Sequence, residues 1–293
     1  MSSIAAARKQ YDIDVEDIEY LRHDGRPLLA RLYRPRGTGP FPAVVFAHGG
    51  AWVDGDRASS EAIHMPVARG GVVILSIEFR VPPQASYPAS FADLNYAIRW
   101  FKHHAARFGS RADLVGTMGT SSGSHMAVLA AMRPKDPRYT VIPLAENPAM
   151  DATVPYVVAL WPVICPLGRY LDRKDKPAHQ DRAAAIPNQL KYWITEEAMA
   201  EGSPMLALER GDPLVLPKIL YLQNPADTLH PRHLMERFVD NFRKAGGDLQ
   251  LELFHGENYD IIRRQPDHPQ SVEITGKIVE YMRQQMPPEL RPS

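Results

Sequence analysis

Residues 114–132 read LVGTMGTSSGSHMAVLAAM, and this stretch decides the fold. Its first part, 114–119, is a short apolar run typical of a buried strand, whereas 122–132 has the small and apolar residues of a buried helix. The turn between them fits the pattern G-x-S-x-G, in which glycines allow a strand to turn sharply into a helix. The stretch therefore predicts a strand–turn–helix unit that exposes Ser121 at the end of a strand.

Strand-like and helix-like runs alternate along most of the remaining chain. Two extended runs, 13–21 and 27–33, are separated by His23-Asp24-Gly25, a hairpin signal. Further strands are expected at 43–47, 72–79, 154–161, 218–223 and 249–254, and helices at 89–108, 231–245 and 271–286. This alternation predicts an α/β fold, with a mostly parallel central sheet flanked by helices.

The pattern weakens between residues 161 and 217, where proline and charged residues accumulate around one short expected helix at 192–201. The mixed charges of residues 169–182 are typical of a solvated surface. A long irregular segment inside a compact domain usually has a function. We therefore expect a single domain over residues 1–293, with a cap-like insertion at about 165–214 that covers the carboxyl edge of the sheet.

The composition excludes several classes of protein. The 293 residues are 44% hydrophobic and 23% charged with no net charge, which favours a globular protein and argues against a nucleic-acid-binding surface. No apolar run resembles a signal peptide or a membrane helix. The single cysteine, Cys165, excludes an intrachain disulfide and a cysteine-based metal cluster. We expect a cytoplasmic protein without a membrane or nucleic-acid partner; self-association remains possible.

The turn at Ser121 suggests nucleophilic chemistry, and a second glycine turn suggests where negative charge is stabilised. His48-Gly49-Gly50-Ala51-Trp52 directly follows the expected strand 43–47. Acyl transfer passes through an oxyanion that needs preorganised donors, usually backbone amides. We assign this oxyanion hole to the amides of Gly50, Ala51 and Ser122, and expect His48 to brace the loop by hydrogen bonds.

Four segments together resemble the hormone-sensitive-lipase-like carboxylesterases, a group of α/β-hydrolases, over about residues 42–282. They are HGGAW with Gly55-Asp56, then Phe79-Arg80-Val81-Pro82-Pro83 followed by Tyr87-Pro88-Ala89 and Asp93, then GTSSGSHMA, and finally Pro225-Ala226-Asp227. The resemblance implies an α/β-hydrolase fold and hydrolysis of a small-molecule ester through an acyl-enzyme, with Ser121 as nucleophile and Asp227 as the acid of the triad. It implies no metal and no organic cofactor.

The histidine that completes such a triad is absent from its usual place. The group carries it after the last strand, in a segment F-x-G-x-x-H-G-F, where this chain reads Phe254-His255-Gly256-Glu257-Asn258-Tyr259-Asp260-Ile261. Tyr259 therefore stands at the position of the histidine. A phenol, with a pKa near 10, is a poor base at neutral pH, whereas imidazole is well suited to exchange a proton with serine.

Four alternatives follow for the missing base. We favour His255, on the same loop as Tyr259, as the catalytic histidine. His230, on the loop of Asp227, and His268, before the last helix, are other candidates, with loop packing or helix capping as their ordinary roles. If no histidine serves, the chain is a non-hydrolytic enzyme or a small-molecule-binding protein in which Tyr259 contacts the ligand.

Other chemically active residues are expected to be structural. His103 and His104 are adjacent on a helix and do not share a face, so no metal site is expected there. His125 and Cys165 are expected to pack in the interior. Three aromatic residues of the insertion either line a substrate pocket or form a small core of their own: Tyr170, Tyr192 and Trp193.

Overall fold

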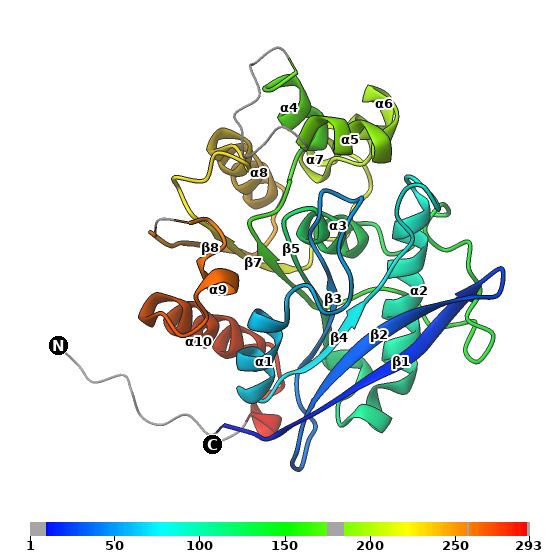
Figure 1. Ribbon diagram of the computed structural model, residues 1–293, viewed down its shortest axis with the longest axis vertical. Helices are drawn as coiled ribbons and strands as arrows, with labels where there is room; N and C mark the ends of the chain where they lie inside the picture. The colour runs from blue at the N-terminus through cyan, green and yellow to red at the C-terminus, as the bar shows by residue number, and fades with distance from the viewer. Residues whose placement is uncertain (1–9, 175–184, 257, 292–293) are drawn as a thin grey trace.

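The computed structural model of the protein describes residues 10–174, 185–256 and 258–291 (Figure 1). Within them, eight strands form one sheet in the order β1-β2-β4-β3-β5-β6-β7-β8. The strands are β1 (Ile13–His23), β2 (Arg26–Pro35), β3 (Ala43–Ala47), β4 (Val73–Ile77), β5 (Val115–Thr120), β6 (Tyr156–Leu160), β7 (Lys218–Gln223) and β8 (Leu249–Leu253). Strands β3 to β8 are parallel, whereas β1 and β2 form the antiparallel hairpin predicted from the sequence. The prediction of a mostly parallel α/β sheet is confirmed.

Helices cover both faces of the sheet (Figure 1). On one face lie α1 (Glu61–Arg69), α9 (Ile261–Arg264) and α10 (Pro269–Gln284), whose buried residues share one apolar cluster with β3, β4 and β6. On the other lie α2 (Ala89–His104), α3 (Ser121–Met132) and α8 (Arg232–Lys244). Short 3₁₀ helices span Ala105–Phe108, Ala112–Leu114 and Pro288–Leu290. The fully buried central strands explain why the sequence shows continuous apolar runs rather than alternation.

Helix α1 is one of several helices that were not predicted from the sequence. It contains Pro66, and a proline inside a periodic run normally argues for a break. Here the helix forms because tertiary contacts outweigh this local preference: Ile63, Val67 and Ala68 are completely buried beneath α9 and α10.

Four helices lie between β6 and β7, and Figure 1 shows them gathered at one end of the molecule, at the top of the view beside α8. They are α4 (Pro166–Leu171), α5 (Ala185–Trp193), α6 (Glu196–Glu201) and α7 (Pro204–Arg210). The single helix expected at 192–201 is confirmed only from Glu196 onward, because residues 192–193 end the preceding helix α5. Ile194 has a φ of 66°, and the Thr195 hydroxyl caps a new helix by accepting from Ala198 N. Part of the charge-rich run expected at the surface lies outside the described residues, at 175–184.

Among the described residues, no helix combines the length and the apolar character needed to cross a membrane.

Candidate active site

Ser121 lies on a strained turn between β5 and α3. Its φ is 51°, a left-handed conformation that an L-residue adopts only when its surroundings enforce it. The surroundings are backbone: a Cβ on Gly119 would lie 2.6 Å from the carbonyl carbon of Gly123. A Cβ on Gly123 would lie 2.1 Å from Ala47 O. Only glycine fits at both positions, which explains the G-x-S-x-G spacing and fixes the direction of the Ser121 side chain.

The glycine loop after β3 packs directly against this turn. Gly49 N donates to Thr120 Oγ1 over 3.1 Å, and His48 braces the loop by a 2.7 Å hydrogen bond between its Nδ1 and Gly49 O. The His48 ring stacks on Phe79 with 4.2 Å between centroids, and burial lowers the pKa of this imidazole. His48 is thus held as a neutral structural group, as expected from the sequence.

Three successive residues of this loop have positive φ: Gly50 at 111°, Ala51 at 53° and Trp52 at 63°. The carbonyl of Gly50 accepts from Val53 N and Asp54 N, which turns the chain sharply. Within the described part of the chain, no acceptor is assigned to the amides of Gly50 or Ala51. These amides can therefore donate to a ligand beside Ser121, as can the first-turn amides of α3.

The histidine beside Ser121 is His230. Its Nε2 lies 2.9 Å from Ser121 Oγ, and its Nδ1 lies 2.5 Å from Asp227 Oδ2. Both His230 and Asp227 are buried, with 3% and 6% of their surfaces exposed. A carboxylate can only accept, so Nδ1 carries a proton and Nε2 is free to receive one from the serine. The three side chains form a Ser–His–Asp relay in which acid and histidine come from one loop.

This loop, between β7 and α8, is shaped by its own polar side chains. Asp227 Oδ1 accepts from Leu229 N over 2.7 Å and from His230 N over 3.2 Å, which bends the chain back on the carboxylate. The side-chain amide of Gln223, at the end of β7, donates from Nε2 to His230 O over 2.7 Å. Asn224 ties the loop to Gly256 by a 2.9 Å hydrogen bond. The loop therefore holds the imidazole ring in a fixed orientation.

Asp227 is ionised although it is buried. Burial alone would raise its pKa, but the adjacent His230 and the two backbone amides stabilise the charged form, and the net pKa lies below the usual value for aspartate. The carboxylate is thus available to orient His230 throughout the neutral range.

The structure corrects the placement expected for His255. This residue is exposed just after β8, and Ser121 Oγ donates its hydrogen bond to His230 Nε2 instead. His268, the third candidate, lies at the start of α10 and accepts from Gln270 N, so it caps that helix. A signal for His230 was present in the sequence: the spacing Asp227-x-x-His230 directly after a buried strand, where a tight loop returns the histidine to the carboxylate.

Tyr259 lies beside His230 rather than replacing it. The two rings meet edge to face with 5.4 Å between centroids, and Tyr259 also contacts Trp161 at 6.0 Å. Burial, helped by the nearby Asp260 and Asp227 carboxylates, raises the pKa of the phenol. A raised pKa leaves even less of the phenolate form at neutral pH than in a free tyrosine, so this residue is unsuited to deprotonate Ser121.

The aromatic residues of the insertion join it to the sheet domain. Tyr192 stacks on Trp52 with 5.6 Å between centroids, and Trp193 packs on Tyr87 at 4.6 Å. His125 receives the indole N–H of Trp52 over 3.3 Å and bonds to Gly202 O over 2.7 Å. These side chains thus form a shared core between the insertion and the loop of the expected oxyanion hole.

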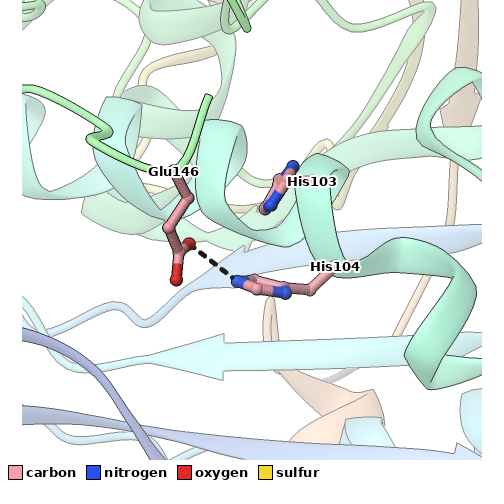
Figure 2. A group of neighbouring side chains, drawn as sticks. All are labelled: His103, His104 and Glu146. Atoms are coloured by element: carbon pink, nitrogen blue, oxygen red, sulfur yellow. Dashed lines mark hydrogen bonds and ion pairs between the residues drawn. The ribbon is translucent and has the colours of Figure 1, made fainter. Parts of the chain in front are cut away.

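One group among the described residues has the composition of a metal site, and it lies at the far end of α2 (Figure 2). Ligand atoms of His103, His104 and Glu146 lie within 4.8 Å of one another, and His104 Nε2 contacts a Glu146 oxygen at 3.0 Å. The expectation that the adjacent histidines would point apart overlooked Glu146, which approaches from another segment. His103 and Glu146 are exposed, and none of the three residues belongs to the Ser121 relay.

Comparison with known proteins points to esterases. The BD-FAE family model matches residues 31–186. Esterase LipC of Mycobacterium tuberculosis is 30% identical over 236 residues, which cover 77% of this chain and 55% of that protein. The isoprenylcysteine alpha-carbonyl methylesterase ICME of Arabidopsis thaliana is 24% identical over 80% of this chain and 54% of its own length. The chain thus spans about half the length of these curated relatives.

Solved structures share the whole architecture. An esterase from Pyrobaculum calidifontis superimposes with a TM-score of 0.75 at 22% identity, covering 93% of this chain and 85% of that one. The carboxyl esterase 2 of Tuber melanosporum also superimposes with a TM-score of 0.75, at 17% identity, covering 94% of this chain and 89% of that one. These likenesses confirm the fold, while the family match and the identity to LipC confirm the resemblance to esterases of this fold. The chain has the α/β-hydrolase fold and belongs to the BD-FAE family.

Proposed function

We propose that this protein is a carboxylic ester hydrolase that works through Ser121, His230 and Asp227. The observation that carries the proposal is the pair of hydrogen bonds on His230, 2.9 Å to the serine oxygen and 2.5 Å to the carboxylate. A base that is oriented by a third group and bonded to a strained serine is the signature of an activated nucleophile. The names of the relatives, esterases of several kinds, support this reaction class.

The mechanism follows from the positions of the groups. Ser121 Oγ attacks the acyl carbon while His230 Nε2 takes its proton, and Asp227 stabilises the imidazolium that forms. The amides of Gly50, Ala51 and Ser122 are the donors we assign to the oxyanion. His230 then returns the proton to the leaving alcohol, and a water molecule, activated by the same imidazole, releases the acid. No step requires a metal or an organic cofactor.

The histidine of this proposed triad is displaced from the loop after β8 to the loop after β7. Catalysis depends on where Nε2 and Nδ1 lie, not on which loop carries the ring. Because His230 occupies the space next to Ser121, the residue at position 259 does not need to act as the base. Tyr259 packs against the imidazole instead. We propose that Tyr259 keeps the ring in position and borders the substrate site. Helices α4 to α7 then act as the cap over this site.

Esterase assays with and without the serine oxygen test this function. Wild type is expected to hydrolyse p-nitrophenyl butyrate with a kcat about 10⁴-fold or more above that of Ser121→Ala, because the variant retains only binding and the oxyanion donors. If wild type is no faster than Ser121→Ala with short p-nitrophenyl esters, the hydrolase proposal fails. A ligand-binding or non-hydrolytic role would then account for the site.

Two substitutions of Tyr259 separate its ring from its hydroxyl group. Tyr259→Phe is expected to keep kcat/KM within about threefold, since the edge-to-face contact with His230 survives. Tyr259→Ala is expected to lower it ~10- to 100-fold, because a loosened imidazole loses its alignment with Ser121. If Tyr259→Phe falls as far as Tyr259→Ala, the hydroxyl group contacts the substrate or takes part in proton transfer.

A further inference from the structure

Arg169 is a buried cation in the first helix of the insertion. It lies in α4, which starts a few residues after β6, and the connecting segment contacts the catalytic turn through a 3.3 Å hydrogen bond from Val163 N to Ser121 O. Only 3% of Arg169 is exposed. The sequence placed this residue in a charged, solvated run, and the structure contradicts that placement. Arginine is almost never fully buried unless its charge is compensated.

The contacts of Arg169 do not compensate its charge. Nε and Nη2 both donate to Gln189 Oε1, over 3.0 and 2.7 Å, and the guanidinium carbon lies 5.2 Å from the centre of the Trp52 ring. Gln189 is itself completely buried and neutral. In the described residues no carboxylate is bonded to Arg169, and no acceptor is assigned to Nη1. Burial lowers the pKa of the guanidinium to about 9, so it remains charged at neutral pH.

The same cavity contains Arg169 and His230. It is narrow, too narrow for a water molecule in this structure, so a group that enters it must be small and must displace side chains. Its lining is mostly apolar apart from these two residues and Gln223, with Val163, Ile164 and Leu234 among the apolar members. Asp227 is the acid whose charge acts on Arg169, and its carboxylate is already bonded to His230.

We propose that Arg169 binds a carboxylate on the acyl part of the substrate, and that the protein prefers esters of short dicarboxylic acids. This inference rests on the proposed ester hydrolysis. A guanidinium with an unbonded nitrogen offers directed, charge-assisted hydrogen bonds that a carboxylate matches well. A bound carboxylate also supplies a negative charge bonded directly to Arg169, which Asp227 does not, since its carboxylate is bonded to His230. The lining that the cavity shares with Arg169 and His230 is mostly apolar, which suits the short methylene chain that links the two carboxyl groups.

Two esters of similar size, p-nitrophenyl hemisuccinate and p-nitrophenyl valerate, differ mainly in the charge at the end of the acyl chain. The measured quantity is the ratio of their kcat/KM values. Wild type is expected to favour the hemisuccinate at least about 10-fold, and Arg169→Gln is expected to lower the ratio ~10- to 100-fold, the range of a hydrogen bond to a charged group. Arg169→Lys keeps the charge and is expected to retain part of the preference.

Arg232→Gln is the matched control. Its side chain is 57% exposed at the start of α8 and pairs with Glu236, so the variant removes one positive charge without touching the cavity and is expected to keep the wild-type ratio. A wild type that prefers the valerate overturns the proposal, and this result needs no variant. A loss in Arg169→Gln that is equal for both esters also overturns it, since Arg169 then only attaches the insertion to Trp52.

A binding measurement separates this inference from the proposed function. Calorimetry with Ser121→Ala and monoethyl succinate is expected to show binding that weakens ~10- to 100-fold when Arg169→Gln is added. If wild type hydrolyses neither ester but this binding is found, ester hydrolysis fails and the carboxylate site stands. If the valerate is hydrolysed but neither binding nor a preference is found, ester hydrolysis stands and the carboxylate site fails.

Discussion

His230→Ala is expected to lower kcat/KM for p-nitrophenyl butyrate by about 10⁴-fold or more, to the level of Ser121→Ala. The reason is geometric. Nε2 of this imidazole is the basic atom bonded to Ser121 Oγ, and without it the serine must lose its proton to water. Members of a triad act as a unit, so the double variant with Ser121→Ala is expected to be no slower than either single variant.

The matched control for this prediction is His255→Ala. His255 is exposed at the end of β8, on the loop where the resemblance placed the catalytic histidine. We expect its removal to change kcat/KM by less than about threefold, as is usual for a surface substitution. A large loss in His255→Ala together with an active His230→Ala would show that the loops rearrange when substrate binds, and would reject the proposed triad.

Asp227→Asn is expected to lower kcat by about 10⁴-fold while leaving the shape of the site almost unchanged. An amide is nearly isosteric with the carboxylate, but it no longer provides two accepting oxygens. Its NH₂ group can instead donate to Nδ1, which favours the wrong tautomer of His230 and removes the stabilising negative charge. Steady-state kinetics at neutral pH, with Asp240→Asn on the exposed face of α8 as control, measures the effect.

The lowered pKa of Asp227 also predicts how the effect of Asp227→Asn depends on pH. Because His230 and the loop amides outweigh the burial effect and hold that pKa below its ordinary value, the wild-type carboxylate stays ionised through the neutral and mildly acidic range. Asp227→Asn should therefore be slow at every pH in that range. A variant with wild-type kcat would show that the 2.5 Å contact between His230 and Asp227 does not contribute to catalysis.

The fold was predictable because it is specified locally. Buried strands such as β3 and β6 are continuous apolar runs, and Gly119 and Gly123 mark the turn at Ser121 because a side chain there would collide with backbone. These signals need only a few neighbouring residues. The same holds for Ser121, the proposed nucleophile, whose exposure depends on the strand–turn–helix unit alone.

The proposed base, His230, was not predictable in the same way. Contact between Ser121 and His230 depends on the alignment of β5 with β7 across β6, and no periodic pattern encodes it. The sequence analysis therefore relied on the usual position of the histidine, which Tyr259 occupies here. Arg169 was misplaced for a related reason: its neighbours in sequence are charged, but its partners Trp52 and Gln189 come from other elements.

The central claim is that His230 activates Ser121, and the rate at which a fluorophosphonate probe labels Ser121 tests it without any choice of ester. Mass spectrometry would follow labelling of wild type, His230→Ala and His255→Ala at neutral pH. We predict rapid labelling at Ser121 in wild type and His255→Ala, and labelling slower by at least about 100-fold in His230→Ala. Equal labelling of wild type and His230→Ala, or its loss in His255→Ala alone, would contradict the claim.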